Sequence, residues 1–146
     1  MRPARVLLVD DYQGAAGDLS ACVAKAFELV GTAGDGRALL EAATKLRPDV
    51  VVAEVSMPVM DGLTAMRLIQ QYLPYTRVIL LTSYGDALMA RHALSAGAAG
   101  FIMKADAPTE IVEAIRRVAD GETFVSDAIA MRNASRLFAG ESNSLA

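Results

Sequence analysis

The sequence predicts a three-layer α/β domain in which helices cover both faces of a doubly wound, five-stranded parallel sheet. Short apolar runs rich in β-branched residues recur at intervals of roughly 25 residues. The segments between these runs carry the apolar periodicity of amphipathic helices. Such alternation is typical of a parallel sheet buried on both faces, so we expect five βα units in succession. The predicted strands are residues Arg5–Val9, Glu28–Ala33, Val50–Val55, Arg77–Thr82 and Gly100–Met103.

Apolar side chains at helical spacing predict a helix after each of these strands. In the last helix, Ile111, Ile115 and Val118 form the apolar stripe, and Pro108 suits its first turn. Gly97 and Gly121 follow the fourth and fifth helices, where glycine commonly ends a helix. The predicted helices include residues 19–27, 39–46, 63–73, 86–96 and 109–118.

Composition and charge narrow the class of protein. The chain has 146 residues, 53% of them hydrophobic and 21% charged, as in an ordinary single globular domain. Its net charge of −3 argues against a nucleic-acid-binding domain, which usually has a basic face. The apolar runs are too short to cross a membrane, and Cys22 has no second cysteine for an internal disulfide. We therefore expect a soluble, cytoplasmic domain.

Polar side chains gather at the carboxyl ends of the predicted strands, where open parallel sheets bind their ligands. Asp10 and Asp11 place two carboxylates after the first strand, and oxygen ligands of this kind suit Mg²⁺. Alternatively, one of the two aspartates only caps the following helix. The other polar residues at these strand ends are Glu54, Ser56, Thr82, Ser83 and Lys104.

Four separated motifs resemble, in their order, those of the receiver domain of two-component response regulators. The resemblance extends over residues 4–121, and residues 104–108 and 121–126 look most like the NarL/FixJ subfamily. It implies a flavodoxin-like, CheY-like fold and a signalling role in a phosphorelay rather than an enzymatic one. The four motifs are Val9–Asp11, Glu54–Gly62, Leu81–Ser83 and Phe101–Lys104.

The resemblance also implies roles for the residues at the strand ends. Asp10 and Asp11 would form an acidic pocket for Mg²⁺, and the backbone carbonyl of Ser56 would be a further ligand. Thr82 would donate its hydroxyl, and Lys104 its ammonium group, to a phosphoryl group received from a histidine kinase.

The resemblance places a switch beside this pocket. Thr82 and Ser83 would form part of it, and Phe101 occupies the aromatic position that turns inward when Thr82 shifts toward the phosphoryl group. Because Phe101 has no hydroxyl, packing alone would report the switch. Alternatively, Phe101 is simply a core residue.

Glu54 departs from the family pattern, because it stands where the phosphoacceptor and metal-binding aspartate is expected. Its carboxylate projects about 1.5 Å further than that of aspartate, roughly one C–C bond. A misplacement of about 1 Å can slow a transfer reaction about a hundredfold, so we expect a phosphorylation-deficient site. The longer side chain would reach toward Lys104 and Thr82. There the carboxylate either mimics a phosphoryl group in part or only neutralises Lys104. Two origins are also open for this residue: Glu54 is natural, or it is an engineered replacement of aspartate.

The expected organisation is a receiver domain over residues 1–125, followed by a helix and linker over residues 126–146. The helix would run from Ser126 to Ala139, and the residues after it have linker composition. The resemblance to the NarL/FixJ subfamily implies a helix-turn-helix DNA-binding domain after the receiver, and none is expected here. The chain is then either a fragment of a transcriptional regulator, the interpretation we favour, or a stand-alone receiver. The expected partners are a histidine kinase and a second copy bound through surface helices, with no nucleic acid or membrane.

Two other functions remain open at this point. The domain could act in protein interactions independently of phosphorylation. It could also be a small Mg²⁺-dependent α/β protein that binds a diffusible phosphate compound in the same crevice. The glycine-rich segment Gly31–Gly36 matches neither common phosphate-loop pattern, which argues against the second alternative.

Overall fold

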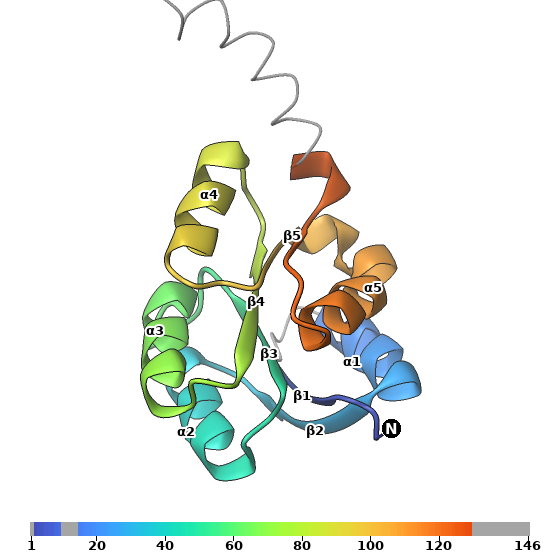
Figure 1. The fold of residues 1–146 in the computed structure, drawn as a ribbon, viewed down its shortest axis with the longest axis vertical. Coiled ribbons are helices and arrows are strands. Elements are labelled where there is room, and N and C mark those ends of the chain that lie inside the picture. Colours follow the sequence, from blue (N-terminus) through green and yellow to red (C-terminus); the bar gives the residue numbers. More distant parts are fainter. Residues whose placement is uncertain (1, 10–14, 130–146) are drawn as a thin grey trace, which may run out of the picture.

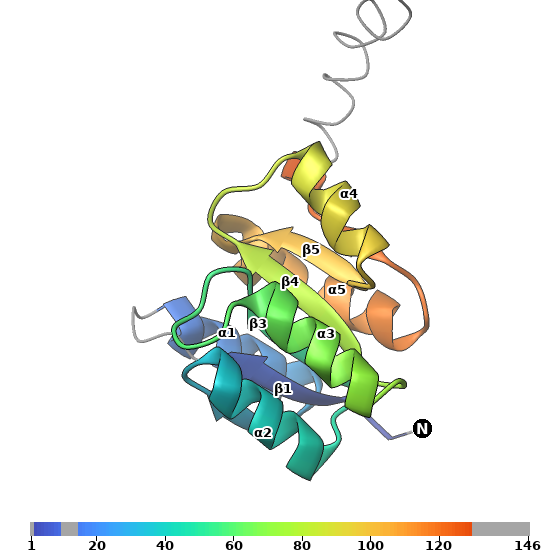
Figure 2. The same ribbon diagram turned by 90° about the vertical axis from the view of Figure 1, so that its left-hand side faces the viewer.

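The computed structural model describes residues 2–9 and 15–129, with side chains from residue 19 onward in the second stretch. A parallel sheet forms the middle layer, with strand order β2-β1-β3-β4-β5-β6. Helices lie on both of its faces (Figures 1 and 2), which confirms the predicted three-layer α/β fold. The strands are β1 (Arg5–Val9), β2 (Glu28–Ala33), β3 (Val50–Glu54), β4 (Arg77–Thr82), β5 (Gly100–Met103) and β6 (Phe124–Val125).

One α-helix follows each of the strands β1 to β5. Helices α1 and α5 pack together on one face, whereas α2, α3 and α4 cover the other (Figure 1). None of the helices described here has the length and apolar character needed to span a membrane. The helices are α1 (Ala15–Ala26), α2 (Gly36–Leu46), α3 (Gly62–Tyr72), α4 (Ala87–Ser95) and α5 (Ala107–Ala119), with a 3₁₀ turn at Lys104–Asp106.

Consecutive residues of the central strands face opposite helical layers. In β3, Val50 and Val52 pack into the core beneath α1 and α5, whereas Val51 and Ala53 pack beneath the other three helices. All four side chains are fully buried. Because side chains alternate across a strand, a strand covered on both faces needs an apolar residue at every position. This requirement explains the uninterrupted apolar runs in the sequence.

The sheet has one strand more than the five predicted. Residues Phe124 and Val125 form β6, which pairs in parallel with β5. A two-residue strand is too short to show any periodicity, so the sequence pattern did not reveal it. The next residues are also packed against the domain, since Ser126 is 0% and Ile129 1% exposed. Residues 127–129 are helical, and the remainder of the predicted Ser126–Ala139 helix lies outside the described residues.

The ends of the helices follow from a few side chains. Asp35, Asp61 and Asp86 are N-caps, and each accepts a hydrogen bond from the backbone N–H three residues further on. Gly97 and Gly121 have positive φ angles of 111° and 94°, a conformation that glycine adopts without steric cost. Both lie just after a helix, as predicted.

Candidate functional site

Three strand ends bring predicted site residues to one edge of the sheet. Glu54 is the last residue of β3, Thr82 is the last of β4, and Lys104 directly follows β5. The parallel register pairs Thr82 with Met103, the residue before Lys104. The convergence expected at the carboxyl ends of parallel strands is therefore present.

Glu54 and Lys104 form an ion pair at this edge. The distance from Lys104 Nζ to Glu54 Oε1 is 2.6 Å, and the two side chains are 27% and 13% exposed, respectively. A hydrogen bond between two charged groups is stronger than one between neutral groups, and partial burial reduces its screening by salt. The pair therefore fixes one carboxylate oxygen of Glu54 on the ammonium group of Lys104.

Thr82 makes its hydrogen bonds within the loop that follows β4. Its hydroxyl donates to the backbone carbonyl of Tyr84 at 2.7 Å and accepts from the Tyr84 backbone N–H at 3.2 Å. Thr82 is only 6% exposed, so both hydrogen bonds involve a side chain that is largely shielded from solvent. Sequence reasoning placed Thr82 at the site but did not identify Tyr84 as its partner, because no motif marks a backbone acceptor.

A pocket of about 310 Å³ opens at this edge of the sheet. It combines the ion pair with apolar side chains from the loop after β3, from β4 and from α4. Ser56 and Ser83, both predicted site residues, line it and are exposed. The lining residues are Glu54, Val55, Ser56, Leu81, Thr82, Ser83, Tyr84, Met89 and Lys104.

The loop after β3 rests on the backbone of Glu54. The N–H of Gly62 donates to the carbonyl of Val55 at 2.9 Å. A Cβ atom added at Gly62 would overlap the carbonyl oxygen of Glu54. Within the loop, Val59 has a φ of 70°, a strained conformation for a β-branched residue. Sequence reasoning gave Gly62 no role, although the motif Glu54–Gly62 contained it.

Phe101 points into the core beneath the loop after β4. It is 1% exposed and belongs to the core cluster on the α4 side of the sheet. Gly85 lies directly above it, because a Cβ added there would lie 3.0 Å from Phe101 Cε2 and 2.7 Å from Thr82 Cγ2. Gly85 thus lets the loop approach both Thr82 and Phe101 closely.

The predicted metal ligands are only partly described. Asp10 and Asp11 lie outside the described residues, so their roles stay predictions. In the part of the chain that the structure describes, no three His, Cys, Asp or Glu residues gather as a metal site. The pocket lining supplies one carboxylate, on Glu54, and includes Ser56, whose backbone carbonyl is the predicted ligand. These are oxygen donors of the type that Mg²⁺ prefers, although one Glu54 oxygen already contacts Lys104.

Residues 6–116 match the response regulator receiver domain family. The chain belongs to this family and is a receiver domain of the two-component signalling class. Domains of this class are signalling modules that interact with histidine kinases.

Relatives of known sequence and structure include regulators of the NarL and LuxR type. The chemotaxis protein CheY of Thermotoga maritima is 36% identical over 115 residues, covering 78% of this chain and 96% of the relative. A LuxR-family response regulator from Aurantimonas sp. aligns with a TM-score of 0.84 at 28% identity, covering 92% of this chain and 97% of that chain. The receiver domain of NarL from Mycobacterium tuberculosis aligns with a TM-score of 0.77 at 34% identity, covering 84% of this chain and 100% of that one.

Other relatives are longer proteins, of which this chain matches only a part. The match spans 50% of the transcriptional regulatory protein YxjL of Bacillus subtilis and 59% of MctR of Rhizobium johnstonii.

Proposed function

We propose that this receiver domain carries Glu54 at the position of the phosphoacceptor aspartate, and that this glutamate makes it phosphorylation-deficient. The observation that carries the proposal is the 2.6 Å ion pair between Glu54 and Lys104. Glu54 is the last residue of β3, the place at which receiver domains carry their acceptor. Lys104 has the place, after β5, of the lysine that would bind the incoming phosphoryl group.

The length of the glutamate side chain explains the proposed loss of acceptor function. Its carboxylate lies about one C–C bond, 1.5 Å, further from the backbone than that of aspartate. In-line phosphoryl transfer depends on the alignment of the nucleophile, so this shift alone costs on the order of a hundredfold in rate.

Mg²⁺ is the metal that we propose for this site. Asp10, Asp11, Glu54 and the backbone carbonyl of Ser56 would hold it, and all four are hard oxygen donors. When bound, the ion would offset negative charge on the phosphoryl oxygens. Within the chain itself, Lys104 and the Thr82 hydroxyl would supply the remaining contacts to such a group.

The hydrogen bonds of Thr82 favour a silent site, in which Glu54 neither accepts nor mimics a phosphoryl group, over a site in which Glu54 mimics one. A bound phosphoryl group would engage both Lys104 and Thr82, whereas Glu54 engages Lys104 and the Thr82 hydroxyl donates to Tyr84. One carboxylate also carries less charge than the about −1.5 to −2 of a phosphoryl group. The buried position of Phe101 is the observation that favours partial mimicry as the second candidate.

The wider setting of the domain follows from its class. We propose a histidine kinase as partner, self-association through surface helices, and a cytoplasmic location in a transcriptional regulator. The matches to part of YxjL and MctR support a place within a longer regulator. An interaction domain that works without phosphorylation remains compatible with a silent Glu54.

Phosphoryl uptake tests the proposal. The native protein and its Glu54→Asp variant are incubated with Mg²⁺ and a small phosphodonor, and their intact masses are measured. We expect one phosphoryl group on the variant and none on the native chain, because only aspartate aligns its carboxylate for transfer. A Thr44→Ala variant, altered at an exposed hydroxyl on α2, controls for handling and should behave as native.

Two results would contradict the proposal. Uptake by the native chain would show that Glu54 does not prevent transfer. Absence of uptake by both proteins would show that the loss extends beyond residue 54, and would favour the interaction domain.

A further inference from the structure

Ser126 joins the end of β6 to the strand that leads to Lys104. Its backbone N–H donates to the carbonyl of Phe101 at 3.1 Å. Its hydroxyl oxygen accepts from the Met103 backbone N–H at 2.8 Å and donates to Glu110 Oε1 at 2.6 Å. Ser126 itself is 0% exposed, and its hydrogen bonds to Met103 and Glu110 are part-buried. Ser126 is therefore hydrogen-bonded to Phe101 and Met103, the two neighbours of Ile102 in β5.

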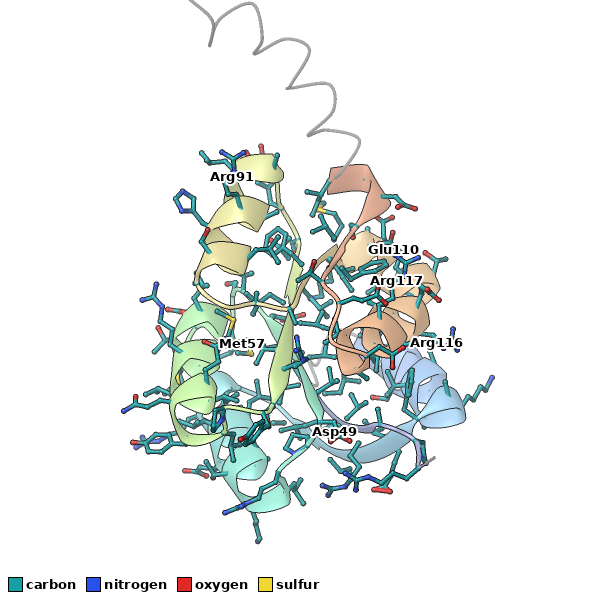
Figure 3. All side chains as sticks on the ribbon, viewed as in Figure 1. Asp49, Met57, Arg91, Glu110, Arg116 and Arg117 are labelled. Carbon is teal, nitrogen blue, oxygen red and sulfur yellow. The ribbon has the colours of Figure 1, made fainter. Side chains whose placement is uncertain are left out.

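Glu110 lies on α5 (Figure 3). Its second carboxylate oxygen binds the backbone directly after Ser126. Glu110 Oε2 accepts from the Asp127 backbone N–H at 3.1 Å. The N–H of Ile129 donates to the Ser126 carbonyl at 3.0 Å, and the Ile129 side chain is buried. We call the side chains of Ser126 and Glu110, with the backbone N–H groups of Met103 and Asp127, the Ser126 clasp.

The Ser126 clasp begins one residue from the Glu54–Lys104 ion pair. Met103 pairs with Thr82 on one side and donates to Ser126 on the other. Lys104 is the next residue along the chain. Any displacement of the Lys104 backbone therefore acts, through Met103, on the Ile102–Met103 peptide, whose N–H makes one of the hydrogen bonds of the clasp.

We propose that the Ser126 clasp transmits displacements of Lys104 to the segment of residues 127–129. This inference deepens the proposed signalling function and rests on it. Ser126 and Glu110 act as positioning residues, because they connect the site to that segment without contacting the site themselves. A buried hydroxyl suits this task, since losing either partner leaves an unsatisfied polar group and makes an intermediate arrangement unfavourable.

Hydrogen exchange of the Asp127 and Ile129 amides tests the proposal. The ion pair is removed by Lys104→Met, once in the native chain and once together with Ser126→Ala. In the native background we expect Lys104→Met to speed exchange at both amides about threefold to tenfold, the equivalent of one net hydrogen bond. In the Ser126→Ala background, Lys104→Met should add less than about twofold, because the connection is already broken.

Two further variants keep the test independent of misfolding. Glu110→Gln retains an oxygen for Asp127 but gives the Ser126 hydroxyl no charged acceptor, so the response to Lys104→Met should be intermediate. Thr109→Ala, altered at an exposed hydroxyl of the same helical turn, should leave the response as in the native chain. Circular dichroism confirms that each variant is folded.

An equal effect of Lys104→Met with and without Ser126 would overturn the proposal and leave the clasp a purely structural feature. Failure of the clasp and failure of the proposed function are distinguishable. Phosphoryl uptake by Glu54→Asp tests the site alone, and adding Ser126→Ala to that variant should leave uptake unchanged. If Glu54→Asp is phosphorylated but the effect of Lys104→Met does not depend on Ser126, only the clasp is refuted. If Glu54→Asp is not phosphorylated, the proposed function is refuted.

Discussion

Replacing Gly62 by alanine is expected to destabilise the domain by about 3 kcal/mol or more. The new Cβ atom would overlap the carbonyl oxygen of Glu54 and would lie 3.0 Å from Cα of Val55. Both neighbours are backbone atoms, so no side-chain rotation can relieve the contact. Either the end of β3 or the first turn of α3 must move, and Glu54 moves with it. Urea unfolding, compared with the native chain, gives the change in free energy.

Gly31→Ala is the matched control for this substitution. A Cβ atom at Gly31 would lie 3.2 Å from Cδ1 of Leu46, which is the end of a flexible side chain. We expect a change of no more than about 1 kcal/mol, since that side chain can shift slightly. If Gly62→Ala proved as mild as Gly31→Ala, the loop after β3 would not be held against Glu54 in the way described.

Truncating Phe101 to alanine is expected to cost about 3–5 kcal/mol of unfolding free energy. Phe101 is among the largest fully buried side chains and lies beneath Gly85 and Thr82. Its removal leaves a cavity under the loop that holds the Thr82 hydroxyl. The unfolding midpoint should therefore fall strongly, and the Tyr84 amide should lose protection from hydrogen exchange.

Tyr84→Ala controls for the loss of an aromatic ring from the same region. The Tyr84 side chain is 78% exposed, and its contribution at the site comes from its backbone. We expect a change within about 0.5 kcal/mol. Equal losses for the two variants would contradict the assignment of Phe101 to the core.

Most of the fold could be predicted from the sequence because its signals are local and repeated. A strand buried on both faces must be apolar throughout, as β3 (Val50–Glu54) is up to its last residue. An amphipathic helix such as α5 shows the apolar stripe of its buried face directly in the sequence. The short β6 strand could not be predicted, because two residues carry no period. Its place depends on pairing with Gly100 and Phe101, which are far away in the sequence.

The candidate site could be predicted as a set of strand-end residues, but not as a network of bonds. The rule for parallel sheets brought Glu54, Thr82 and Lys104 to one edge, and the reach of glutamate indicated the contact with Lys104. The partner of Thr82 is a backbone carbonyl, which leaves no trace in residue type. Ser126 appeared only as the start of a helix, because its contact with Glu110 depends on the tertiary fold.

Amide signals in the ¹H–¹⁵N NMR spectrum test most directly whether Glu54 leaves this receiver silent. The Tyr84 amide donates to the Thr82 hydroxyl oxygen and therefore reports on the loop after β4, while the Phe101 amide reports on the residue that carries the buried aromatic ring. The native chain is compared with Glu54→Asp before and after phosphorylation. We predict that the native signals coincide with those of the unmodified variant. Coincidence with the phosphorylated variant would contradict the silent site and show that Glu54 mimics a phosphoryl group.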